Sequence, residues 1–198
     1  MYGLVNRAVR DLIIKESGED AWSRIRDHAG IVQDNFNAMD AYPDSITYDL
    51  VGSASELLKV PAEDILKQFG RHWILYTAAE GYGEMMDTWG DSVAEFLENL
   101  NALHARLRTA MPHLNPPSFE VVAPGPGSLT LRYWSNRASL APMVIGILEG
   151  LGERFDTPVT AEIASLKSAG QDYDEFAVRW TSAQEAAVPV EDLRAKAA

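Results

Sequence analysis

The first part of the chain has apolar residues that recur every three to four positions, which is the spacing of amphipathic helices. A proline at a helix start and the capping box Ser92-Val93-Ala94-Glu95 mark two of the expected helix beginnings. The spacing predicts helices over residues 3–16, 19–29 and 44–58, from Pro61 through Tyr76, and over 91–111.

The pattern then changes to short stretches in which apolar and polar residues alternate, as in half-buried strands. We expect strands over 119–123, 129–134, 159–166 and 175–181, with a helix over 139–155. Helices followed by antiparallel strands indicate the α+β class, with an N-terminal helical subdomain and then a four-stranded antiparallel sheet with helices. The predicted domain covers residues 1–182, with a helical part to about residue 111 and a helix/sheet part over about 112–182. Residues 183–198 are expected to form a loosely ordered tail.

Composition narrows the function classes. The 198 residues suit one domain with a sizeable core, and the net charge of −12 argues against nucleic acid or an anionic membrane surface as a partner. The longest uncharged apolar run, 140–148, is too short to span a bilayer, and charges interrupt any signal-peptide core at the N-terminus. These features predict a soluble cytoplasmic protein.

His104 lies on the apolar stripe of the predicted 91–111 helix. A histidine in such a place is commonly a core residue bonded to a carbonyl oxygen. The alternative is a metal ligand, because a buried neutral imidazole binds iron well. The remaining histidines have ordinary interpretations: His28 at a helix edge, His72 within reach of the core, and His113 in a proline-flanked surface loop.

Tyr133, Ser135 and Arg137 are spaced two apart at the end of a predicted strand. In an extended chain such residues point to one face, so two hydroxyls and a guanidinium converge. The planar guanidinium suits carboxylates, and a porphyrin with its two propionates would suit this clamp. The ordinary alternative is a strand end with solvated polar residues.

Together these residues resemble the H-NOX (heme-nitric oxide/oxygen binding) family, which also forms the sensor of soluble guanylate cyclase. Four stretches carry the resemblance, in the order and spacing of the family, and they extend it to about residue 181. They are Met1–Asn6, Asn99–His104, Pro116–Phe119 and Tyr133-x-Ser135-x-Arg137. The resemblance implies a stand-alone domain of bacterial type, with heme buried between the helical and the helix/sheet parts.

The resemblance also implies roles for single residues. His104 would ligate a non-covalent heme b (iron protoporphyrin IX), and the chain has no Cys for covalent attachment or thiolate ligation. Tyr133, Ser135 and Arg137 would hold the propionates, and Pro117 would press on the macrocycle. The other implied heme contacts are Leu4, Val5, Trp73, Met143 and Ile147.

The predicted 139–155 helix bears on which gas is bound. In the family, a tyrosine in this helix accompanies stable oxygen binding, and the matching position here is Met143. Bound dioxygen carries partial negative charge and gains from a donor, whereas NO needs none. Such a hydrogen bond contributes roughly 1.5–3 kcal/mol, or about tenfold to a hundredfold in affinity. The sequence therefore predicts a sensor of NO that also binds CO.

Other functions remain open at this point. Trp73, Tyr76 or Tyr82 could donate to a bound gas, which would favour an oxygen sensor, and a redox sensor could use the same heme. A peroxidase or oxygenase would need a distal acid–base group, against which the apolar 140–148 run argues. A helical adaptor without a cofactor would make His104 a core residue. No stretch resembles an output module, and by resemblance the partner in trans is a histidine kinase or a cyclic-dinucleotide enzyme.

Overall fold

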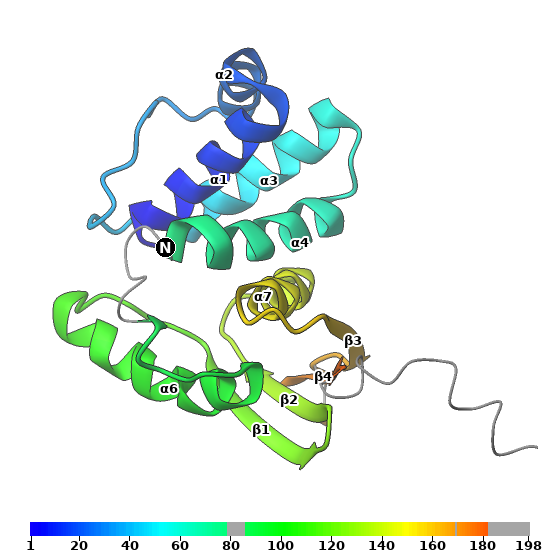
Figure 1. The fold of residues 1–198 in the computed structure, drawn as a ribbon. Helices are drawn as coiled ribbons and strands as arrows, with labels where there is room; N and C mark the ends of the chain where they lie inside the picture. The colour runs from blue at the N-terminus through cyan, green and yellow to red at the C-terminus, as the bar shows by residue number, and fades with distance from the viewer. Residues whose placement is uncertain (79–85, 169, 182–198) are drawn as a thin grey trace, which may run out of the picture.

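The computed structural model describes residues 1–78, 86–168 and 170–181. Tyr82 and the predicted tail 183–198 lie outside these ranges. The N-terminal helices gather in one layer, which is the upper part of Figure 1. They are α1 (Gly3–Ser17), α2 (Glu19–His28), α3 (Asp44–Leu58) and α4 (Ala62–His72).

The helix predicted from Pro61 through Tyr76 is not regular to its end. After α4 it continues as a π-helix, η1 (Trp73–Thr77). A π-turn holds one extra residue and so shifts which side chains face inward. Ile74 and Ala78 are buried, whereas Tyr76 is 45% exposed.

Helix α6 (Val93–Ala110) confirms the predicted capping box. The Glu95 backbone N–H donates to Ser92 Oγ at 3.3 Å, and the Glu95 carboxylate accepts from the Asp91 N–H at 3.0 Å. The reciprocal bond thus goes to the residue before the N-cap. The cap fixes where the helix begins, and the buried apolar stripe of Phe96, Leu100 and Leu103 sets the face on which His104 lies.

The second layer is a four-stranded antiparallel sheet in the order β1-β2-β4-β3. Figure 1 shows α7 (Ala141–Arg154) between this sheet and the N-terminal helices. The predicted α+β class and antiparallel sheet are confirmed. The strands are β1 (Ser118–Gly125), β2 (Ser128–Trp134), β3 (Val159–Ser165) and β4 (Asp174–Trp180).

Two apolar cores lie on either side of the α4–α7 contact. One core fills the N-terminal helices around Trp22 and Phe69, and the other joins α6, α7 and the sheet around Phe96 and Phe176. Trp73 packs against both cores. Helix α6 therefore shares its core with the sheet, although in sequence it belongs to the predicted helical part.

Helices α4 and α7 approach so closely that their contact requires glycine. A Cβ on Gly146 would overlap the Lys67 carbonyl oxygen, and a Cβ on Gly70 would overlap the Met143 carbonyl oxygen. A salt bridge between Lys67 and Glu149, 2.9 Å long, flanks this contact. The contact fixes the position of Met143 relative to α4.

Replacing Gly146 by alanine is expected to lower the stability of the fold by about 1–3 kcal/mol, because the added methyl group forces two backbones apart. The melting temperature, measured by circular dichroism, should fall by several degrees. Gly52→Ala in α3 is the matched control, since a Cβ there meets nothing within 4 Å and alanine favours helix. Equal melting temperatures for the Gly146 variant and the unmodified chain would contradict the close contact.

Candidate functional site

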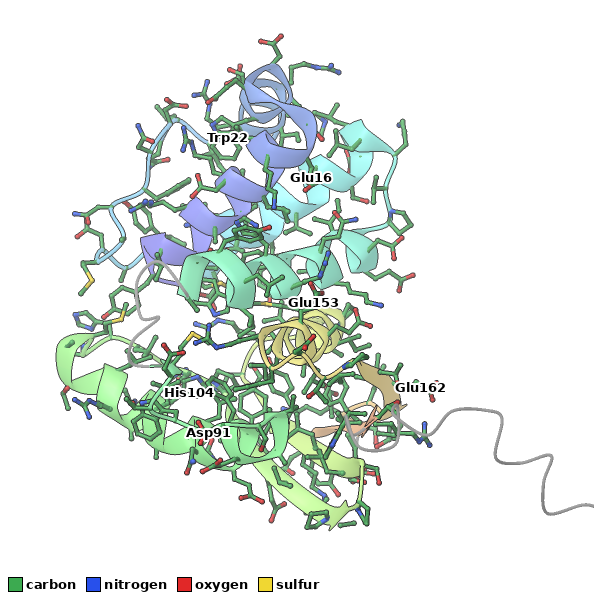
Figure 2. All side chains as sticks on the ribbon, viewed as in Figure 1. Glu16, Trp22, Asp91, His104, Glu153 and Glu162 are labelled. Carbon is green, nitrogen blue, oxygen red and sulfur yellow. The ribbon has the colours of Figure 1, made fainter. Side chains whose placement is uncertain are left out.

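A cavity of about 290 Å³ lies between α6 on one side and α4 and α7 on the other. Figure 2 shows His104 on the green α6 helix, below the N-terminal helices. The cavity brings together every residue that the sequence predicted as a ligand contact: Leu4, Val5, Trp73, His104, Pro117, Tyr133, Ser135, Arg137, Met143 and Ile147.

The His104 side chain is held in one tautomer. Its Nδ1 lies 3.2 Å from the Pro117 carbonyl oxygen, and because a carbonyl only accepts, Nδ1 carries the ring proton. Burial lowers the pKa of His104 below its ordinary value and outweighs the opposing effect of this hydrogen bond. The imidazole is therefore neutral near pH 7, with a lone pair on Nε2 that can bind a metal.

Asn101, one turn before His104, fastens α6 to the start of β1. Its Nδ2 donates to the Phe119 carbonyl oxygen at 2.6 Å, and its Oδ1 accepts from the Phe119 N–H at 2.9 Å. With the His104–Pro117 bond, these contacts fix the imidazole relative to the Pro117–Phe119 segment. The sequence analysis missed this role, although the spacing of three residues places both side chains on one face of the helix.

Tyr133, Ser135 and Arg137 meet at one end of the cavity, but not through an extended strand. Strand β2 ends at Trp134, and the Arg137 backbone N–H then donates to Ser135 Oγ at 3.0 Å. The predicted strand geometry is thus wrong for Ser135 and Arg137, because the serine hydroxyl stabilises a turn instead. Burial raises the pKa of Tyr133, against the opposing hydrogen bond with Ser135, so its phenol is neutral.

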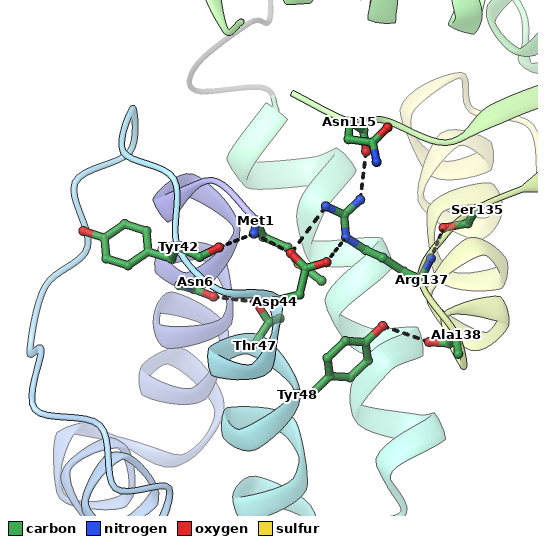
Figure 3. A network of polar contacts seen from close by, with 10 residues as sticks. All are labelled: Met1, Asn6, Tyr42, Asp44, Thr47, Tyr48, Asn115, Ser135, Arg137 and Ala138. Carbon is green, nitrogen blue, oxygen red and sulfur yellow. Dashed lines mark hydrogen bonds and ion pairs between the residues drawn. The ribbon is translucent and has the colours of Figure 1, made fainter. Parts of the chain in front are cut away.

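Asp44, in the first turn of α3, is a site residue that the sequence analysis missed. Arg137 Nε donates to its carboxylate at 2.8 Å, and the Met1 ammonium donates to it at 2.5 Å (Figure 3). Burial acts to raise the pKa of Asp44, but the hydrogen bonds from the ammonium and from Arg137 prevail and lower it. An acidic residue at a helix start is ordinary, so nothing in the sequence singled it out.

Two more hydrogen bonds connect the N-terminal layer to segments beside the cavity. The Tyr48 hydroxyl donates to the Ala138 carbonyl oxygen at 2.9 Å, next to Arg137 (Figure 3). The Tyr2 hydroxyl accepts from the backbone N–H of His113 at 3.1 Å. The loop after α6 and the turn after β2 are thereby both attached to the helical layer.

The wall opposite α6 is mainly apolar. Phe69 of α4 and Met143, Val144 and Ile147 of α7 line it. The Thr47 hydroxyl also lies there, but it donates to Asn6 Oδ1 at 2.6 Å and is thus engaged within the protein. This wall suits a ligand that needs no hydrogen bond.

The three donors considered from sequence differ in position. Trp73 lines the cavity, whereas Tyr76 does not line it and has the Lys15 ammonium 3.7 Å from its ring centroid. Tyr82 lies outside the described residues. The sequence analysis had named both as possible donors but only Trp73 as a heme contact, and in the structure Trp73 lines the cavity whereas Tyr76 is 45% exposed.

The charge of the cavity wall is unlike that of the chain. The chain has a net charge of −12, yet no Asp or Glu occurs among the described residues that line the cavity. The basic side chains in the wall are His104, His113 and Arg137. Apolar walls for a flat macrocycle, a neutral imidazole for iron and a cationic end for carboxylates are what a heme requires. The residues present fit this group.

A sequence profile described as Haem-NO-binding matches residues 2–163. The chain belongs to this family. Haem-NO-binding, or H-NOX, domains are heme-binding gas sensors that act in signal transduction. Within the described residues, the structure has no helix of the length and apolarity that crossing a membrane requires.

Similar curated proteins are much longer than this H-NOX chain. Soluble guanylate cyclase gcy-32 of Caenorhabditis elegans is 30% identical over 164 residues, which cover 81% of this chain and 24% of the cyclase. Guanylate cyclase soluble subunit beta-2 of Rattus norvegicus is 38% identical over 105 residues, covering 52% of this chain and 15% of the subunit. The chain thus spans a quarter or less of these relatives.

Solved H-NOX structures share the fold. The H-NOX protein from S. oneidensis in the Fe(II)NO ligation state has a TM-score of 0.82 at 17% identity, covering 92% of this chain and all of that one (100%). The Fe(II) unliganded H-NOX protein from K. algicida has a TM-score of 0.79 at 20% identity, with coverage of 92% and 97%. At these sequence identities the comparison shows a shared fold alone.

Proposed function

We propose that this H-NOX chain is an NO sensor that holds heme b non-covalently, with His104 as the residue that would bind the iron. The neutral His104 imidazole, whose Nδ1 is bonded to Pro117 and whose Nε2 is available, supports the ligand assignment. We assign the propionates to Tyr133, Ser135 and Arg137. The remaining contacts with the macrocycle are assigned to Leu4, Val5, Trp73, Pro117, Met143 and Ile147.

The observation that carries NO selectivity is the apolar α7 wall formed by Met143, Val144 and Ile147. Bound dioxygen gains from a hydrogen-bond donor, and α7 offers none to the cavity. Trp73 is the described aromatic donor that lines this wall, and through its indole N–H an oxygen sensor remains the second candidate.

The same wall argues against a peroxidase or oxygenase. Those reactions need an acid–base group beside the bound oxygen. The described residues of α4 and α7 that line the cavity include no His, Asp or Glu. We therefore propose a sensor rather than an enzyme, and a peroxide turnover assay on the loaded chain distinguishes the two.

We propose that α6 is the element that carries the signal. A heme held by His104 would supply an iron that can bind NO, and NO binding would weaken the bond between the iron and His104. Release of His104 would leave α6 attached to β1 through Asn101 and its apolar packing. Two positions of one helix supply the bistable element of a switch. The output would go to a cytoplasmic partner in trans, either a histidine kinase or a cyclic-dinucleotide enzyme.

The ferrous protein is expected to bind NO and CO and to form no stable oxy complex in air, and the NO complex is expected to be five-coordinate. Met143→Tyr should raise oxygen affinity by about tenfold or more, because a phenol in the wall can donate to bound dioxygen. Electronic absorption spectra under each gas provide the measurement. Met143→Phe, which adds the ring without the hydroxyl, is the matched control.

A persistent oxy spectrum of the unmodified chain in air would contradict NO selectivity. It would assign the donor role to a side chain outside α7, and Trp73→Phe would then test the indole. The heme assignment would be unaffected by that outcome.

A further inference from the structure

His113 lies at the mouth of the cavity, where it lines the wall and is exposed to solvent. Its backbone N–H donates to the Tyr2 hydroxyl, which holds the loop after α6 against the helical layer. This bond uses only the main chain, so the imidazole is not needed for it. The assignments above leave the His113 side chain without a role.

The propionate clamp carries too little positive charge for two carboxylates. Arg137 Nε is paired with Asp44, and Arg137 Nη1 donates to the Asn115 carbonyl oxygen at 2.8 Å. The same Asp44 carboxylate also faces the Met1 ammonium. Two cations thus share one anion, which leaves a single excess positive charge. A heme brings two carboxylates, so one of them lacks a cation.

The basic groups near the mouth narrow the choice of that cation. His104 Nδ1 donates a hydrogen bond to the Pro117 carbonyl oxygen, and burial keeps the imidazole neutral. Arg108 of α6 donates to the Leu114 carbonyl oxygen at 3.3 Å, but it does not line the cavity. His113 is therefore the remaining basic side chain in the described part of the cavity wall.

The position of His113 suits this role. Asn115, two residues further along the same loop, is bonded to Arg137. Two residues span at most about 7 Å of extended chain. The His113 backbone is therefore tied to the neighbourhood of the clamp, on the solvent side of the cavity.

We propose that His113 is a charge partner of the second heme propionate at the mouth of the cavity, in addition to the hydrogen bonds that the Tyr133-x-Ser135-x-Arg137 clamp offers to both propionates. The inference rests on the proposed heme-binding function. It predicts that heme retention follows the charge at position 113, because an ion pair there acts directly on a carboxylate of the ligand.

A series of substitutions that changes the charge at position 113 of the full chain tests the proposed ion pair. The purified protein is loaded with hemin, and the rate of heme transfer to an apo-globin acceptor is measured. The rate should rise in the order His113→Lys, unmodified chain, His113→Gln, His113→Glu. Each step should be about two- to fivefold, the range of an exposed charge pair. Arg108→Gln is the control for a nearby cation outside the cavity and should leave the rate unchanged.

The same series with hemin dimethyl ester separates direct contact from a structural effect. The ester has no free carboxylates, so the four proteins should lose it at equal rates. Equal rates with ordinary hemin would overturn the inference, and so would a charge order that persists with the ester. Failure of the unmodified chain to take up hemin would overturn the proposed function and this inference together. Normal hemin uptake with equal transfer rates in all four proteins would overturn this inference alone.

Discussion

Replacing His104 by glycine is expected to abolish stable heme binding while the chain keeps its fold. The imidazole supplies the protein–iron bond that we propose. Burial holds it neutral, and its Nδ1–H donates a hydrogen bond to the Pro117 carbonyl oxygen. The glycine leaves room for a small ligand. Added imidazole should therefore restore binding, as measured by the heme absorption spectrum and by heme content.

The control for this substitution is His28→Gln. His28 Nδ1 lies 3.1 Å from Ser53 Oγ, and His28 does not line the cavity, so its loss should leave heme content unchanged. Full heme occupancy of the His104→Gly protein without imidazole, and with an unaltered spectrum, would refute the ligand assignment. In that case His104 would be a core residue bonded to a carbonyl, which was the ordinary alternative.

Arg137→Ala is expected to speed heme transfer to an apo-globin acceptor by about tenfold to a hundredfold, the effect of losing a hydrogen bond to a charged group. The substitution removes the guanidinium, and it also leaves the Asp44 carboxylate at the clamp with the Met1 ammonium as its remaining charge partner. The negative charge of the Asp44 carboxylate would then be less neutralised, and it would repel the propionate. Ser135→Ala removes one neutral hydroxyl and should have a smaller effect.

Arg132→Ala is the matched control for loss of an arginine. Arg132 pairs with Glu120 and Glu175 across strands β1, β2 and β4, and it does not line the cavity. Its transfer rate should equal that of the unmodified chain. A larger effect of Ser135→Ala than of Arg137→Ala would contradict the clamp.

The elements could be predicted because their signals are local. Apolar spacing and the capping box placed α6 to within a residue or two of Val93–Ala110, and alternation placed β2. The continuation of α4 was predicted less well, because a π-turn inside a helix leaves the apolar spacing nearly unchanged. Trp73, four residues after Phe69, continues the cavity-lining face of α4, whereas Tyr76, inside the π-helix, is 45% exposed and does not line the cavity.

By itself the sequence determined the α+β class and the order of the elements, since these depend on short-range patterns. Through resemblance to the H-NOX family it also singled out His104, Tyr133, Ser135 and Arg137 as candidate site residues. Only the tertiary structure decided what those side chains bond to. Asp44 meets Arg137 across 93 positions of the chain, and the His104 proton is directed by the carbonyl of Pro117, 13 positions away. His113 similarly reaches the cavity mouth because its loop is bonded to Tyr2, 111 positions away. Such contacts arise when distant segments pack together, and no periodicity or spacing within one segment encodes them.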